Sequence, residues 1–229
     1  MTPSEVRPSP GTGGAAAHRT VRRGSTAPRL ARLVRLARLH LASRQAPVAL
    51  AVIAGCGLLL RLLLRTQVIE GSGNLAQQVP LLLEGTVAVA VSVATRNPFG
   101  ESERGTGGRL PWLRLFAVLA TSAAAVGGPT AGALGARLPG GDWAVLRNVA
   151  GLTGIGLLCA VLLGGALAWA GPLAGTAIGE FALTGSWHSP WMFPARPPHD
   201  LGAALCAGLL FAAGAALVTI RGPRDTDRE

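Results

Sequence analysis

The stretch NVAGLTGIGLLCAVLLGGALAWAGPLAGTAIGEFALT, residues 148–184, decides the fold, because Glu180 is its single charged residue. A membrane-spanning helix needs roughly 17 to 25 predominantly apolar residues, and this stretch is too long for one such helix. We therefore predict that it holds two spans. The break is expected at Gly171 and Pro172, because proline removes a helical donor and biases the preceding residue away from helical angles.

Four further apolar stretches complete a set of six spans. They run over residues 46–64, 75–95, 111–134 and 201–220. The sequence thus predicts an all-α, polytopic membrane protein with a six-helix transmembrane domain over residues 46–220. The short segment 172–187 makes the fifth span, and the proline-rich loop that follows it is expected to cap the bundle, in part as a re-entrant segment.

The arginines predict the orientation in the membrane. Nine of the 21 basic residues precede residue 46, four lie within 96–114 and three follow residue 220. Because cytoplasmic loops carry an excess of arginine and lysine, we expect the plasma membrane as the location, with both termini cytoplasmic. The segment 221–229 is then a cytoplasmic tail. The opposite side keeps Arg137, Arg147 and Arg196.

The segment before the first span divides into two parts. Residues 1–28 are rich in Pro, Gly, Ser and Arg and are expected to be a disordered tail. Residues 29–44 place apolar side chains on one helical face and arginines largely opposite, which predicts an amphipathic helix at the membrane surface. The alternative is a plain cytoplasmic extension of the first span.

Composition excludes several kinds of chemistry. The chain has a formal charge of +10, but its arginines follow the predicted cytoplasmic segments, so a membrane protein explains them better than a nucleic-acid-binding protein. It has no lysine and therefore no P-loop of its own. The composition, rich in Ala, Gly, Leu and Arg, suggests an actinobacterial source. The three cysteines fall in different spans, and His188, His199 and Asp200 lack a recognised metal-ligand spacing. We therefore expect no metal or cofactor site, no catalytic residue and no enzymatic activity.

Small residues recur at every fourth position in three of the spans. Such rows allow close approach of helix backbones, and we interpret them as packing within the chain first and as subunit contacts second. The rows are Gly128, Gly132 and Ala136 in the third span, Gly156, Ala160, Gly164 and Ala168 in the fourth, and Ala204, Gly208, Ala212 and Ala216 in the sixth.

Charges inside the spans are the first candidates for function, because burying a charge in a membrane is costly. Arg61 and Glu84 fall on successive antiparallel spans, both roughly 8 to 12 Å below the outer surface at about 1.5 Å per residue. They form either part of a substrate path or a structural pair in which Glu84 neutralises Arg61. Glu180 falls near the middle of the fifth span, where lining a cavity, staying protonated and pairing with an arginine all remain open.

The loop between the second and third spans is a candidate docking surface. Its segment NPFGESE consists of turn-forming residues, one aromatic side chain and acidic residues, with Asn97, Pro98, Phe99, Gly100, Glu101 and Glu103 as the candidates. The alternative is a plain connecting loop.

The arrangement resembles the ABC-2 type permease subunits of bacterial ABC exporters. An amphipathic helix, six spans with both ends inside, a cytoplasmic loop after span two and an outer excursion before span six carry this resemblance, together with the segments ATRNPFGESER and LPWLRL. It implies a separate ATPase subunit that docks on residues 29–44 and 96–104, and a homo- or heterodimer of permease subunits in the lipid bilayer. The alternative is a scaffold or assembly protein that transports nothing.

Overall fold

The computed structural model describes residues 46–66, 75–95, 110–135, 140–185, 189 and 191–224. This part of the chain is all-helical, and it contains six helices long and apolar enough to cross a membrane, so the predicted fold class is confirmed. They are α2 (Ala46–Arg65), α3 (Leu75–Ala94), α4 (Leu110–Gly132), α5 (Gly141–Leu162), α6 (Ala170–Gly185) and α7 (Leu201–Arg221). The predicted segments 1–28 and 29–44 lie outside the described residues.

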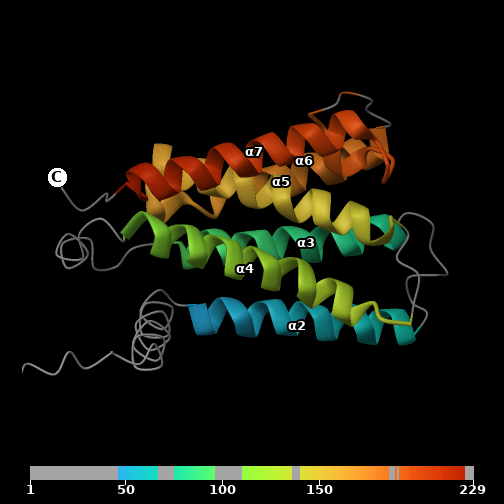
Figure 1. Ribbon diagram of the computed structural model, residues 1–229. Coiled ribbons are helices and arrows are strands. Elements are labelled where there is room, and N and C mark those ends of the chain that lie inside the picture. The colour runs from blue at the N-terminus through green and yellow to red at the C-terminus, as the bar shows by residue number, and fades with distance from the viewer. Residues whose placement is uncertain are drawn as a thin grey trace, which may run out of the picture.

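Helix α5 forms the centre of the bundle. It packs against α3, α4, α6 and α7, whereas α2 packs against α3 and α4. Within the span of α5, 67% of the residues are buried, against 28% in α2 and in α7. Figure 1 shows α2 at one edge and α7 at the other, with α2 beginning and α7 ending at the same end of the bundle. The polar residues Arg147, Asn148 and Thr153 of α5 are accordingly buried within the protein.

The turn between α5 and α6 lies earlier in the chain than predicted. Helix α5 ends at Leu162, and Gly164 takes a φ of 100°, which glycine adopts without a side-chain penalty. A short 3-10 helix, η2 (Gly165–Leu167), then leads into α6. Pro172, the predicted point of the break together with Gly171, lies instead in the first turn of α6. That prediction is wrong, because the N–H groups of a first helical turn have no intrahelical acceptor and proline is tolerated there.

The fourth span is displaced for the same reason. Helix α5 begins at Gly141 rather than at Asn148, so it takes in two charged residues, Asp142 and Arg147. Asp142 lies in the first turn and is exposed, whereas Arg147 is only 5% exposed. Both Arg147 and Asn148 are therefore buried residues of a central helix.

Small residues bring two pairs of helices into close contact. A Cβ atom on Gly57 of α2 would meet the backbone carbonyl of Gly128 of α4, and one on Gly154 of α5 would meet the backbone of α7 at Leu210 and Phe211. The predicted row of the third span thus packs within the chain, except for Ala136, which lies outside the described residues. In the predicted row of the fourth span, Gly156 packs against Ser92 of α3 and Pro172 of α6, whereas Gly164 and Ala168 lie beyond the end of α5. All four residues of the fourth-span row are buried.

The small-residue row of the sixth span faces outward instead. Its members are Ala204, Gly208, Ala212 and Ala216, and all four are exposed in the single chain. The face of α7 that packs against α5 is the neighbouring one, with Ala203, Ala207, Gly214, Ala215 and Val218 buried. Packing within the chain therefore explains two of the three rows and not this one.

Candidate functional site

A cavity of about 270 Å³ lies at the end of the bundle where α3, α5 and α7 begin, here called the cavity end. The first half of α3, the first turns of α5, Leu183 of α6 and the segment 194–198 form its wall. It reaches the surface beside Gln77 and Pro197, which are exposed, and extends inward to Glu84, which is 3% exposed. A buried carboxyl group thus lines a cavity that opens at one end of the bundle.

Glu84, Asn148 and Arg147 form a hydrogen-bonded cluster between α3 and α5. The side-chain amide of Asn148 donates to Oε2 of Glu84 at 2.8 Å, and its Oδ1 accepts from Nε of Arg147 at 3.2 Å. All three side chains are buried. Asn148 therefore joins a carboxyl group and a guanidinium group that make no direct ion pair with each other.

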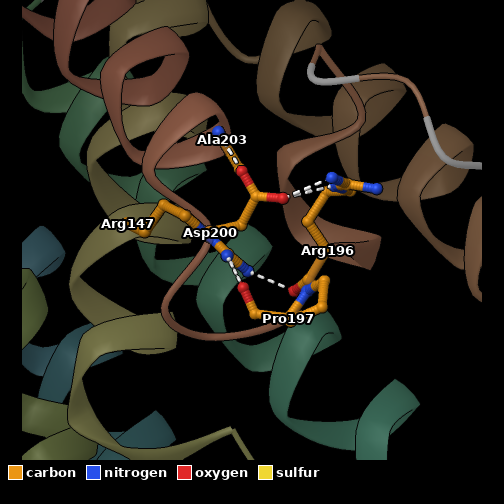
Figure 2. Close-up of polar contacts among 5 residues, drawn as sticks. All are labelled: Arg147, Arg196, Pro197, Asp200 and Ala203. Carbon is orange, nitrogen blue, oxygen red and sulfur yellow. Dashed lines mark hydrogen bonds and ion pairs between the residues drawn. The ribbon is translucent and has the colours of Figure 1, made fainter.

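Arg147 also holds the loop that covers the cavity. Its Nη1 donates to the carbonyl oxygen of Pro197 at 2.6 Å and its Nη2 to that of Arg196 at 3.0 Å. Figure 2 shows the guanidinium group of Arg147 directed at these two carbonyl groups. The loop is thus tied to α5 through its backbone.

Asp200 fixes the other end of the same loop. It caps α7 by accepting from the N–H of Ala203 at 2.9 Å, and its other carboxyl oxygen forms an ion pair with Arg196 (Figure 2). The pKa of Asp200 is lowered, first by the hydrogen bond from Ala203 and then by the Arg196 guanidinium, because both favour the charged carboxylate. The loop and the start of α7 therefore form one connected unit.

An aromatic anchor holds the middle of the loop inside the bundle. Phe193, in the 3-10 helix η3 (Phe193–Ala195), is 2% exposed, and its ring packs where a Cβ atom on Gly151 of α5 would lie. One turn beyond the polar cluster, Ala88 of α3 and Leu152 of α5 are fully buried in the same apolar cluster as Phe193. This apolar layer separates the cavity from the opposite end of the bundle. The loop indeed caps the bundle, as the sequence predicts.

The predicted pair of Arg61 and Glu84 is not formed in the structure. Arg61 is exposed on α2, whereas Glu84 is buried and bonded to Asn148, and no ion pair links the two described side chains. An arginine at such an exposed position can extend its guanidinium group toward the membrane surface.

Glu180 lies apart from the cavity. It is half-buried on α6 and does not line the cavity wall, and its Oε1 is buried without a hydrogen-bond partner among the described residues. The candidate docking residues of the first cytoplasmic loop, 97–101 and 103, lie outside the described residues.

Arg147 and Asn148 are the site residues that sequence reasoning missed. The sequence predicts Arg147 in an outer loop and Asn148 at the start of a span, because Asp142 and Arg147 interrupt the apolar residues before position 148. The sequence offers a weaker signal for them in the glycine pair at 164 and 165, since a break there would start a full-length span near residue 141, but Pro172 is the stronger helix breaker.

No protein-family model, no curated protein and no solved structure matches this chain. The function proposed below therefore rests on the sequence and on the geometry of the bundle.

Proposed function

We propose that the chain is the permease subunit of an ATP-driven transporter of the ABC-2 type, located in the plasma membrane with both termini in the cytoplasm. The observation that supports this most directly is the cavity that reaches from one end of the six-helix bundle to Glu84. Ionisable groups within membrane spans are costly, and they mark paths for substrates or ions. The apolar layer at Ala88 and Leu152 closes the cavity toward the opposite end, as expected for a carrier in one of its two access states.

In this proposal the energy for transport comes from ATP hydrolysis by a separate ATPase subunit. The chain has no lysine, so it cannot supply the lysine with which a P-loop holds the phosphates of ATP. The resemblance to ABC-2 permeases implies an ATPase that docks on the first cytoplasmic loop, and two permease copies or homologues around one path.

Co-purification tests this proposal. The tagged chain, extracted from native membranes under mild conditions, should bring down a polypeptide with ATPase activity. Phe99 is the single aromatic residue of the segment 96–109, and an aromatic side chain in a charged surround is a common binding hot spot. Phe99→Ala should therefore lower recovery of the ATPase by about tenfold or more, since a hot-spot residue contributes at least about 2 kcal/mol.

Phe181→Ala is the matched control. Phe181 is an exposed aromatic residue inside a span, so its substitution should leave recovery of the ATPase unchanged. Recovery of a stable complex without any ATPase from the wild-type protein would contradict the permease function and favour the scaffold or assembly protein instead.

A further inference from the structure

We infer that the cavity binds a short-chain carboxylate together with one proton: the guanidinium group of Arg147 receives the carboxylate, and Glu84 receives the proton. This inference rests on the proposed function, for which it names the substrate class. Three observations carry it: the neutral surroundings of Arg147, the charge that the cavity wall can carry, and the donors and apolar groups that line it.

Arg147 is a buried positive charge on the cavity wall that makes no ion pair among the described residues. It is 5% exposed, and its three hydrogen bonds go to neutral acceptors, the side-chain oxygen of Asn148 and the carbonyl oxygens of Arg196 and Pro197 (Figure 2). A guanidinium group has five N–H groups, so two remain for a ligand, and such a group suits a carboxylate in particular. Arg196, the other arginine of the wall, is paired with Asp200 instead.

The charge of the wall depends on Glu84. Of the residues that line the cavity, only Glu84, Arg147 and Arg196 can carry a charge, and Asp200 matches that of Arg196 from outside the wall. The wall is therefore neutral when Glu84 is ionised, and it carries one positive charge when Glu84 is protonated. In neither state is it negative, so it does not select a cation. With a proton on Glu84 it selects an anion.

A bound carboxylate and an ionised Glu84 would repel each other. Both would lie in one buried cluster with Arg147, and two carboxylates that share such a site do not readily ionise together. A proton on Glu84 removes the repulsion and leaves the charge of Arg147 to match that of the ligand. Asn148 can hold either form of Glu84, since its amide donates to a carbonyl oxygen as well as to a carboxylate oxygen. Binding of the anion is therefore coupled to a proton on Glu84.

The other ionisable side chains described near this end of the bundle add no charge to the wall. They are Arg61, Arg65, Asp142, Glu180, His199 and Asp200. None of them lines the cavity, and Asp200 is matched by Arg196. From α6 the wall receives only the uncharged Leu183. Arg147 is thus the charged group of the cluster that faces Glu84.

The rest of the wall suits a small anion with a short apolar chain. The amide groups of Gln77 and Asn148 are neutral donors, and the start of α5 lies at the cavity without a side-chain cap. The N–H groups of a first helical turn have no intrahelical acceptor and favour negative charge. Leu81, Val145 and Leu183 supply apolar surface. At about 270 Å³ the cavity is slightly smaller than the roughly 300 to 1,000 Å³ of drug-sized ligand sites, so a carboxylate with a few carbons fits it best.

Three probes of similar size test the inference: butyrate, the neutral butyramide and butylammonium. Each is added to the purified full-length protein in lipid nanodiscs at about pH 6 and at about pH 9, where a free carboxylic acid is ionised. Binding is followed by saturation-transfer NMR and by the shift in unfolding temperature. At the lower pH, butyrate should bind the wild-type protein at least about tenfold more tightly than the other two probes do. At the higher pH it should bind several-fold more weakly, because Glu84 must then take up a proton.

Two positions separate the roles of the two groups. Arg147→Gln should weaken butyrate binding by about tenfold or more, because it removes charge-assisted hydrogen bonds, whereas Arg147→Lys keeps the charge and should retain part of the binding. Glu84→Gln keeps an oxygen for Asn148 but cannot ionise, so it should bind butyrate equally at both pH values. Arg61→Gln and Glu180→Gln are the matched controls, since these intramembrane charges do not line the cavity, and they should leave butyrate binding and its pH dependence unchanged.

Several outcomes would overturn the inference. Butylammonium binding that exceeds butyrate binding would show a cation site, and equal binding of all three probes, or binding of none, would show that the cavity does not select an anion. Butyrate binding that is independent of pH in the wild type, or a pH dependence that persists in Glu84→Gln, would show that Glu84 does not take up the proton.

The outcome is separable from that of the proposed function. Probe binding needs only this chain, whereas the permease function depends on recovery of an ATPase partner. A carboxylate site without an ATPase would leave the inference standing and remove the ATP-driven function; an ATPase partner without a carboxylate site would do the reverse.

Discussion

Asn148 joins three parts of the molecule through one side chain. Its amide donates to Glu84 of α3 and its carbonyl accepts from Arg147, which in turn holds the loop before α7. An amide suits this position because it is both a donor and an acceptor. If Asn148 is removed, the buried side chains of Glu84 and Arg147 each lose a hydrogen bond, and the desolvation of their polar groups is no longer compensated. The free energy of the cluster should therefore depend strongly on this residue.

Asn148→Ala should lower the free energy of unfolding by about 1 to 3 kcal/mol, because it leaves buried polar groups of Glu84 and Arg147 unsatisfied. Asn148→Asp should cost more, since it places a second carboxyl group against Glu84. Reversible unfolding in mixed detergent micelles measures both. Thr86→Ala is the control, because Thr86 is exposed on α3 and bonds only to its own helix. Equal losses in Asn148→Ala and Thr86→Ala would show that the cluster contributes nothing.

Asp200 predicts a dependence of stability on pH. Because its pKa is lowered in the folded state, its contribution is fully present above the ordinary aspartate pKa of about 3.9 and is lost as the pH falls through the lowered value. Asp200→Asn keeps a capping side chain but cannot titrate, so it should flatten the decline of unfolding temperature in acid. Asp142→Asn, which removes an exposed carboxyl group at the same end of the bundle, is the matched control. Identical acid profiles for Asp200→Asn and the wild type would contradict this.

At the scale of elements, glycine decides which helices touch. Gly57 and Gly132 place backbone against backbone between α2 and α4, and Gly154 and Gly214 do so between α5 and α7. In lipid the apolar side chains gain little from association, so close packing of this kind is what holds the spans together.

Two glycines of α2 provide a matched pair for testing this packing. Gly57→Ala should destabilise the bundle by about 1 to 3 kcal/mol, because the new methyl group would overlap the carbonyl of Gly128 and push α4 away. Gly55→Ala should cause no loss, since the same methyl group meets open space there and alanine is the better helix former. Unfolding of both variants in micelles measures the difference. A larger loss for Gly55→Ala would contradict the assigned α2–α4 contact.

The number of spans could be predicted from the sequence because it depends on apolar length alone. The boundaries of α5 could not, since two local signals conflicted. Pro172 predicts a helix break, but proline is tolerated in the first turn of a helix, where the structure places it. The turn is made instead at Gly164, whose positive φ is known only from the structure. A break predicted at residues 171 and 172 leaves room for the fourth span to start at Asn148, and Arg147 is then predicted in the outer loop.

The candidate site was harder to predict than the spans. Glu84 lies in the second candidate span, where the sequence predicts it, but the sequence predicts its partner on the first span, at Arg61. The partner instead comes from α5, two spans later, because α3 and α5 run in the same direction and pack side by side. Pairing between helices that are not consecutive depends on the arrangement of the whole bundle, which apolar length does not determine.

At the scale of the whole molecule, the two ends of the bundle differ in charge. Six crossings put the start of α2 and the end of α7 at one end (Figure 1), next to the arginine-rich segments 1–45 and 221–229. Tryptophans lie near both ends and are exposed, Trp112 and Trp169 at this end and Trp143 and Trp191 at the cavity end. Such aromatic belts are typical of side chains at the headgroup level.

Because arginine-rich segments are retained in the cytoplasm, we predict that the cavity opens to the outside. Fusions of a reporter that is active only outside the membrane should therefore be active after Gly140 and inactive after Gly105 and Glu229, and a reporter active only in the cytoplasm should give the opposite pattern. Replacing the arginines of residues 29–44 by glutamine serves as a control: it should weaken the orientation without changing the number of crossings, since those residues precede α2. External activity after Glu229 would mean an odd number of spans or the reverse orientation. A cytoplasmic signal after Gly140 together with an external signal after Glu229 would indicate the reverse orientation. In that orientation the cavity that reaches Glu84 would open to the cytoplasm.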